Sequence, residues 1–197
     1  MTYAELTSAI TSWLHRSDLT AQIDTFIDLT EAAITRGLRT LEMETTTTVS
    51  AAASIALPTG FLEMRSIKLD VNPEHPLDYV PPYTRAALSD GASGVPAYYT
   101  IYNNLIYLLP TPDSSYNVTI SYYKSITPLD STNTSNFLST GHPDLYLNGC
   151  LEQAYLYVQN PAMSQAHNAK FEQLLARING RSKEARWSGA PKAVRAM

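Results

Sequence analysis

Side chains that could carry out metal or nucleophilic chemistry are few in this 197-residue sequence. No two histidines have the spacing of metal ligands on one helix face, and no carboxylate accompanies a pair of them. The four histidines are His15, His75, His142 and His167. Cys150 with His142 or His167 is a conceivable nucleophile and base, but the apolar residues around Cys150 favour a small buried side chain. The G-x-S-x-G, P-loop and G-x-G-x-x-G motifs are absent. The sequence therefore predicts a protein that is not an enzyme, with no metal and no cofactor.

A second group of side chains suggests binding. Residues 177–197 hold six basic residues and one acid, whereas residues 1–176 carry a net charge of −9. The break at Gly189 and Pro191 and the loss of periodicity after Trp187 predict an extended segment over residues 181–197. Such a segment can become ordered on a partner, with an aromatic anchor and basic side chains paired with carboxylates. The basic residues of this segment are Arg181, Lys183, Arg186, Lys192 and Arg195.

The hairpin predicted over residues 98–109 is rich in tyrosine, and aromatic side chains can stack on nucleic acid bases. No basic residue lies among these tyrosines, which favours a half-buried sheet or a protein interface. The composition agrees, because Thr and Ser number 39, Tyr 13, and charged residues only 16 %. Protein interfaces are depleted of charge and enriched in tyrosine.

Charge and composition also exclude several classes of protein. The formal net charge of −4 argues against a protein that reads DNA sequence, which would show a basic face. No apolar run approaches the roughly 20 residues that span a bilayer. The first residues lack the basic and apolar regions of a secretory signal, and a single cysteine excludes an internal disulfide framework. We expect a soluble, cytoplasmically made protein.

Two antiparallel helices are predicted at the N-terminus. Thr2 and Glu5 have the spacing of a capping box, and an apolar stripe that includes Trp13 follows. After a tight connection at residues 16–18, a second stripe extends over residues 23–41 and is interrupted by Gly37. An interior glycine in so regular a stripe indicates close approach of another backbone.

From Glu44 the pattern changes to strands. Residues 45–49 are β-branched without a break, and residues 61–70 and 117–123 alternate between apolar and polar. Asn103 and Asn104 separate two apolar runs as a two-residue hairpin loop, since Asn tolerates positive φ. Residues 72–96 contain five prolines and are expected to form a long exposed excursion.

Helix is predicted again after Gly141, with Pro143 in the first turn. A further helix begins at Pro161, and Asn179 with Gly180 is expected to stop it. The predicted fold class is α+β, a helical bundle from N- and C-terminal helices with an inserted antiparallel β domain. The predicted domains are a helical domain of residues 1–44 and 141–180, a β domain of residues 45–140, and a basic extended tail of residues 181–197.

The order and spacing of these motifs resemble the bacteriophage head-to-tail adaptor (connector) family, including its tail tubular protein A type. The resemblance covers nearly the whole chain except the basic tail. The segments that carry it are residues 14–18 (LHRSD), 36–39 (RGLR), 57–63 (LPTGFLE), the hairpin region 96–110, and 142–147 (HPDLYL).

The resemblance implies a structural role in the virion, at the junction of head and tail, after synthesis in the cytoplasm of the bacterial host. Adaptors of this family form a ring, a dodecamer, that binds the portal protein and a tail nozzle or tail-tube protein, and no membrane is involved. DNA passes through the lumen without specific binding. The alternative is a β-rich tail or fibre-associated binding module, which a native mass would distinguish from a ring.

Two surfaces are expected to serve such a ring. Low charge and small outward residues on two helices predict a head-to-tail subunit contact through Ala33, Gly37, Ala154 and Tyr155. Trp187 and the basic residues of the segment 181–197 are expected to dock on the portal.

Overall fold

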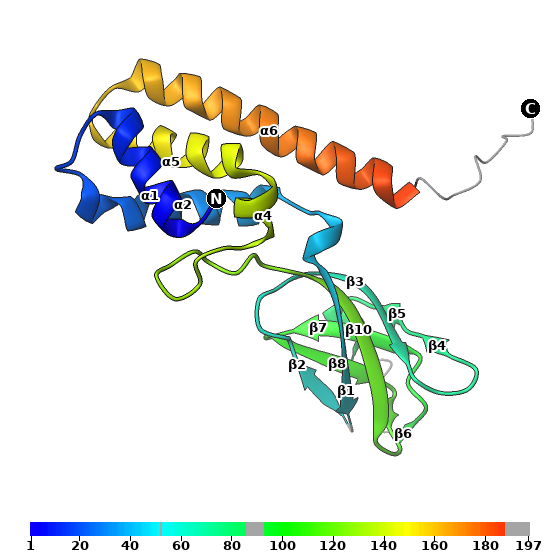
Figure 1. The fold of residues 1–197 in the computed structure, drawn as a ribbon. Helices are drawn as coiled ribbons and strands as arrows, with labels where there is room; N and C mark the ends of the chain where they lie inside the picture. The colour runs from blue at the N-terminus through cyan, green and yellow to red at the C-terminus, as the bar shows by residue number, and fades with distance from the viewer. Residues whose placement is uncertain (52, 86–92, 188–197) are drawn as a thin grey trace, which may run out of the picture. The chain divides into compact units, whose positions relative to one another are not determined.

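A computed structural model describes residues 1–51, 53–85 and 93–187, and the chain divides into two compact units. The helical unit comprises Met1–Glu42 and Ile126–Met197, and the β unit comprises Met43–Ser125. Helices from both ends of the chain pack together, and the strands lie between them in sequence (Figure 1). The predicted α+β fold class is confirmed.

The helical unit is centred on the helix α5, which packs against the four other α-helices of the described chain. These helices are α1 (Tyr3–Leu14), α2 (Ile23–Gly37), α4 (Phe137–Gly141), α5 (Pro143–Tyr157) and α6 (Pro161–Trp187). Two 3-10 helices, η1 (Thr20–Gln22) and η2 (Leu41–Met43), lie before and after α2. The predicted capping box is present, since Thr2 accepts from the Glu5 N–H and Glu5 accepts from the Thr2 N–H.

Two glycines allow close packing between helices. A Cβ on Gly149 of α5 would lie 2.4 Å from Thr30 Cγ2 of α2 and 3.0 Å from Phe171 Cε2 of α6. A Cβ on Gly37 would lie 2.9 Å from Leu175 Cδ2 of α6. The close approach expected at Gly37 therefore exists, but with a side chain of the same subunit.

The helix α6 continues two turns beyond the stop predicted at Asn179 and Gly180. Asn179 does not cap the helix. Its side chain instead donates to the Gly37 carbonyl (2.8 Å) and accepts from the Arg39 N–H (2.9 Å). One turn later, Ser182 Oγ accepts from the Leu41 N–H at 2.9 Å. These bonds to the segment after α2 favour the continued helix, so the extended tail predicted from residue 181 is wrong for residues 181–187, and residues 188–197 lie outside the described part.

Gly180→Ala should raise the free energy of unfolding by about 0.5–1 kcal/mol, because glycine is a poor helix former in a helix interior. Nothing lies within 4 Å of a Cβ at this position, so the added methyl meets no obstacle. Urea denaturation of the variant and the wild type would measure the change. A loss of stability would instead indicate that Gly180 acts as a helix stop.

Residues 126–140 were expected in the β domain but belong to the helical unit. Ile126 and Leu129 are buried, and the Leu129 N–H donates to Glu31 of α2 at 2.8 Å. Asn136 then caps the short helix α4. The segment lacks helical periodicity, and tertiary contacts therefore decide where it packs.

In its described residues, 43–51, 53–85 and 93–125, the β unit contains two four-stranded sheets and one additional strand pair. One sheet has the order β1-β10-β3-β4 and the other β2-β8-β7-β5, while β6 pairs with β9. The strands are β1 (Glu44–Ala51), β2 (Ser54–Ala56), β3 (Phe61–Leu69), β4 (His75–Pro76), β5 (Asp78–Tyr79), β6 (Ser93–Gly94), β7 (Tyr98–Tyr102), β8 (Leu105–Leu109), β9 (Thr111–Pro112) and β10 (Tyr116–Lys124).

The predicted hairpin is confirmed, with β7 and β8 joined at Asn103 (φ 50°) and Asn104 (φ 60°). The long excursion predicted for residues 72–96 is more ordered than expected. It contributes β4, β5, β6 and a 3-10 turn, η3 (Pro82–Thr84), while residues 86–92 lie outside the described part. Leu77 within it is buried, and its N–H donates to the Ile67 carbonyl at 3.0 Å.

The central strand β10 shows one use of the many Thr and Ser residues. Val118, Ile120 and Tyr122 point into the core of the β unit. On the opposite face, Thr119 pairs with Thr48 (2.8 Å between hydroxyl oxygens) and Ser121 with Thr46 (3.1 Å). Hydroxyl pairs of this kind stabilise an exposed sheet face, and the Thr119 hydroxyl also donates to the Asp70 carboxylate at 2.8 Å.

Candidate interaction surfaces

The nucleophile and base conceivable from the sequence do not form an active site. Cys150 is completely buried, and burial raises the pKa of its thiol to about 12, so it stays protonated at neutral pH. Within residues 1–51, 53–85 and 93–187, no three His, Cys, Asp or Glu side chains lie where they could hold a metal ion. Among the same residues, no helix has both the length and the hydropathy to cross a membrane.

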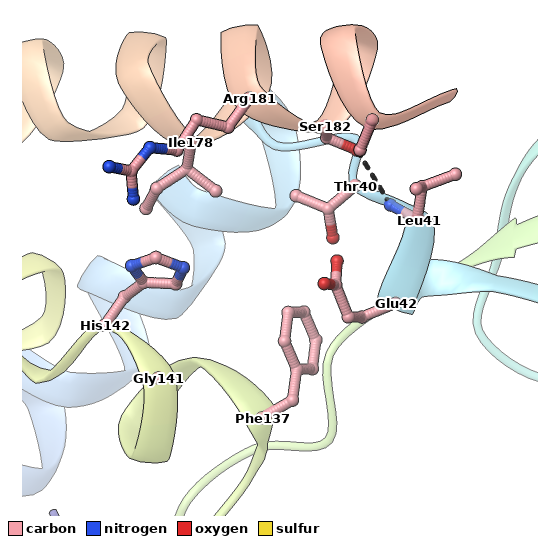
Figure 2. Close-up of a pocket in the computed structure, with 10 residues that line it drawn as sticks. Thr40, Leu41, Glu42, Phe137, Gly141, His142, Ile178, Arg181 and Ser182 are labelled. Atoms are coloured by element: carbon pink, nitrogen blue, oxygen red, sulfur yellow. Dashed lines mark hydrogen bonds between the residues drawn. The ribbon is translucent and has the colours of Figure 1, made fainter. Parts of the chain in front are cut away.

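A pocket of about 310 Å³ lies between the last turns of α6, the α4–α5 corner and residues 40–42. Phe137, Ile178 and Leu41 supply apolar wall, and Figure 2 shows polar groups around it. Thr40 is only 1 % exposed, and its hydroxyl has no hydrogen-bond partner within the described residues. We call this hollow the Thr40 pocket; all of its lining belongs to the helical unit.

Charged side chains lie on different sides of the Thr40 pocket. The Glu42 carboxylate and the Thr40 hydroxyl point toward one another, while the Arg181 guanidinium lies near the His142 ring (Figure 2). Neither Glu42 nor Arg181 forms an ion pair within the described part of the chain. The pocket therefore presents one acidic group and one basic group that are available to a ligand.

A second surface is built around His167 of α6. The His167 ring stacks on Tyr155 of α5, with the centroids 5.4 Å apart and the planes at 8°, and Trp13 of α1 meets it edge-on at 6.3 Å. His167 Nδ1 lies 3.0 Å from Asn148 Oδ1, and burial lowers the pKa of His167, which favours the neutral ring. Trp13 itself is 55 % exposed, although the sequence places it on the apolar stripe of its helix. An exposed tryptophan on a supported stack is typical of an interface anchor.

The four residues predicted for a subunit contact are only in part on the surface. Ala154 is completely buried in the helical unit, so the expectation that its side chain faces outward is wrong. Gly37 packs against Leu175 of its own subunit. Ala33 and Tyr155 are half-buried. The error arose because α2 and α5 pack on one another, and small residues serve that packing.

The residues predicted for portal docking have different positions. Arg181 lines the Thr40 pocket, and Lys183 is exposed. Arg186 is half-buried, and Trp187 is the last residue of α6. Lys192 and Arg195 lie outside the described residues.

The tyrosine-rich hairpin forms part of the β2-β8-β7-β5 sheet, with both exposed and buried rings. Tyr98 and Tyr102 are exposed, while Tyr99 is buried and meets Tyr79 edge-on at 5.6 Å. Arg85 lies over the Tyr107 ring, 3.9 Å from its centroid, a cation–π contact that the sequence did not indicate.

Sequence reasoning missed a buried polar cluster in the helical unit. Glu31 of α2 accepts hydrogen bonds from the Leu129 N–H (2.8 Å) and from the Tyr146 hydroxyl (2.9 Å). Tyr146 also accepts from Asn136 Nδ2 at 2.7 Å. Burial raises the pKa of Glu31, and burial raises that of Tyr146 as well. Glu31 lies on the apolar face of a helix, and this position is the only signal in the sequence that could have indicated the cluster.

Comparison with known families gives a match over nearly the whole chain. The family model described as SU10 adaptor protein matches residues 1–195. No curated protein matches the chain.

Proposed function

This chain belongs to the SU10 adaptor protein family, a family of phage head-tail adaptors, and we propose that it forms a ring between the portal protein and the tail. The observation that carries the proposal is the family match over residues 1–195, which includes both units. The family assignment implies a structural role.

The ring that we propose is a dodecamer at the head–tail junction of the virion, with portal on one side and a tail nozzle or tail-tube protein on the other. DNA would pass through its lumen without specific binding. The net charge of −9 on residues 1–176 supports this idea, since each Lys or Arg contact with phosphate would add affinity and hinder sliding.

The docking element that we propose for the portal is the end of α6 with the residues that follow. Its candidate side chains are Lys183, Arg186, Trp187, Lys192 and Arg195. Arg181 belongs to the Thr40 pocket and is therefore a less direct candidate. Basic side chains around a tryptophan would suit an acidic, partly apolar portal surface.

The chain shortened after Trp187 and the Trp187→Ala variant should both bind purified portal more weakly, the latter by about 30-fold or more, as is usual for a tryptophan anchor. The cut falls after Trp187 because a cut at Gly180 would remove Ser182 and its bond to the Leu41 N–H. Affinity would be measured at two salt concentrations, and ring formation on the portal by native mass spectrometry. Lys170→Ala, on α6 outside its last turns, is the matched control for lost charge. Equal binding by all chains would assign portal binding to the body of the subunit.

A further inference from the structure

Trp13 and the turn that follows it form an exposed, amphipathic patch. The Trp13 indole N–H makes no hydrogen bond within the described residues, although its ring is supported by His167. Two residues after the end of α1, Arg16 pairs with Asp18, and both side chains are largely exposed. We call Trp13, Arg16 and Asp18 the Trp13 knob.

The Thr40 pocket offers groups that match this knob. The buried Thr40 hydroxyl lacks a partner, and an indole N–H is a donor without acceptor capacity. Phe137, Leu41 and Ile178 supply the apolar wall that an aromatic ring would cover. A buried polar atom without a partner costs free energy, which a donor from outside would recover.

The charges are complementary as well. Glu42 could pair with Arg16, and Arg181 with Asp18. The Arg16–Asp18 pair is exposed and therefore contributes little to the stability of the subunit, so exchanging its partners costs little.

Knob and pocket lie at opposite ends of the helical unit. The knob precedes α2, and residues 40–42 of the pocket follow it, so the 15 residues of α2 separate them by about 22 Å. Along α6, His167 contacts Trp13, whereas Ile178 and Arg181 line the pocket. The knob therefore cannot reach the pocket of its own subunit.

We propose that the Trp13 knob of one copy inserts into the Thr40 pocket of the next copy. Because two different patches meet, the contact is head-to-tail and repeats from copy to copy, which closes into a ring at a suitable rotation. The inference rests on the proposed function, since it names the subunit contact of the adaptor ring. Tyr155 takes part indirectly, through the stack that holds His167 against Trp13.

The first test measures self-association by sedimentation and native mass spectrometry. Trp13→Ala should raise the dissociation constant by at least about 30-fold. Arg16→Glu and Glu42→Arg should each weaken association by about tenfold or more, because each places like charges together. The double variant Arg16→Glu with Glu42→Arg should return to within about threefold of the wild type, since opposite charges face each other again. Leu156→Ala, which removes another exposed apolar side chain of the helical unit, is the matched control and should leave association unchanged.

The second test uses the head-to-tail character of the contact. Trp13→Ala keeps an intact pocket, and Glu42→Arg keeps an intact knob. A mixture of the two should form a 1:1 dimer and stop there, because the remaining knob and the remaining pocket are both defective. Circular dichroism of each variant would verify that the subunit is folded.

The outcomes distinguish failure of this contact from failure of the proposed function. Rings of unchanged size in Trp13→Ala and in both single charge variants would overturn the contact and leave the adaptor ring in place. A wild-type chain that is monomeric at about 1 mM but forms rings on portal would also overturn this contact alone. A wild-type chain that forms no ring in either setting would overturn the proposed function.

Discussion

Gly149→Ala should lower the free energy of unfolding by about 1–3 kcal/mol, even though alanine is the better helix former. The added Cβ would lie 2.4 Å from Thr30 Cγ2 and 3.0 Å from Phe171 Cε2. Thr30 is buried, and its hydroxyl donates to the Phe26 carbonyl at 2.7 Å, so this side chain cannot rotate away freely. The helices α2 and α6 would have to move apart from α5.

Urea denaturation of Gly149→Ala, with Gly141→Ala as the matched control, would measure this effect. Nothing lies within 4 Å of a Cβ on Gly141, so the control carries the same chemical change without the collision. Equal stability of Gly149→Ala and the wild type would show that the three helices do not need this close approach.

Tyr146→Phe should lower the free energy of unfolding by about 1–3 kcal/mol. The ring is completely buried and remains in place, but Glu31 loses one donor and Asn136 Nδ2 loses one of its two acceptors, keeping the Thr127 carbonyl. Tyr116→Phe removes a hydroxyl that is bonded to Asp113 at an exposed site, and serves as the control with an expected small effect. A Tyr146→Phe variant as stable as the control would mean that the buried cluster contributes little.

The same cluster predicts a pH dependence with a defined sign. Burial raises the pKa of Glu31 in the folded state above its ordinary value of 4.5, so the folded chain holds this proton to higher pH than the unfolded chain does. The contribution of Glu31 to the free energy of unfolding is therefore largest below pH 4.5 and decreases as the pH rises through the raised folded-state pKa. Glu31→Gln cannot titrate, so the stability difference between wild type and variant should shift in favour of the variant over this range. A difference that is constant with pH would contradict the raised pKa.

Local signals in the sequence sufficed for the elements that are stabilised locally. The capping box of Thr2 and Glu5 depends on a spacing of three residues, and the turn at Asn103 and Asn104 depends on the tolerance of Asn for positive φ. Both features are readable from neighbouring residues, and both are present.

The errors concern features that depend on distant partners. The stop expected at Gly180 failed because Asn179 bonds to Gly37 and Arg39, about 140 positions earlier in the chain. The outward position expected for Ala154 failed because small residues suit helix packing as well as interfaces. The Thr40 pocket combines residues from three separate segments, and no spacing in the sequence indicates such a combination.

The hydrogen bonds beside the two chain connections between the units bear on how such proteins can change in evolution. On the helical side, Asn179 and Ser182 hold the segment that leads into residue 43, and Glu31 holds the segment that returns after residue 125. None of these bonds involves a residue of the β unit. Both ends of the β unit are therefore held by bonds within the helical unit. The sequence and length of the β unit can change without loss of these bonds. Changes in the β unit could then accumulate while the part that we assign to ring formation stays constant.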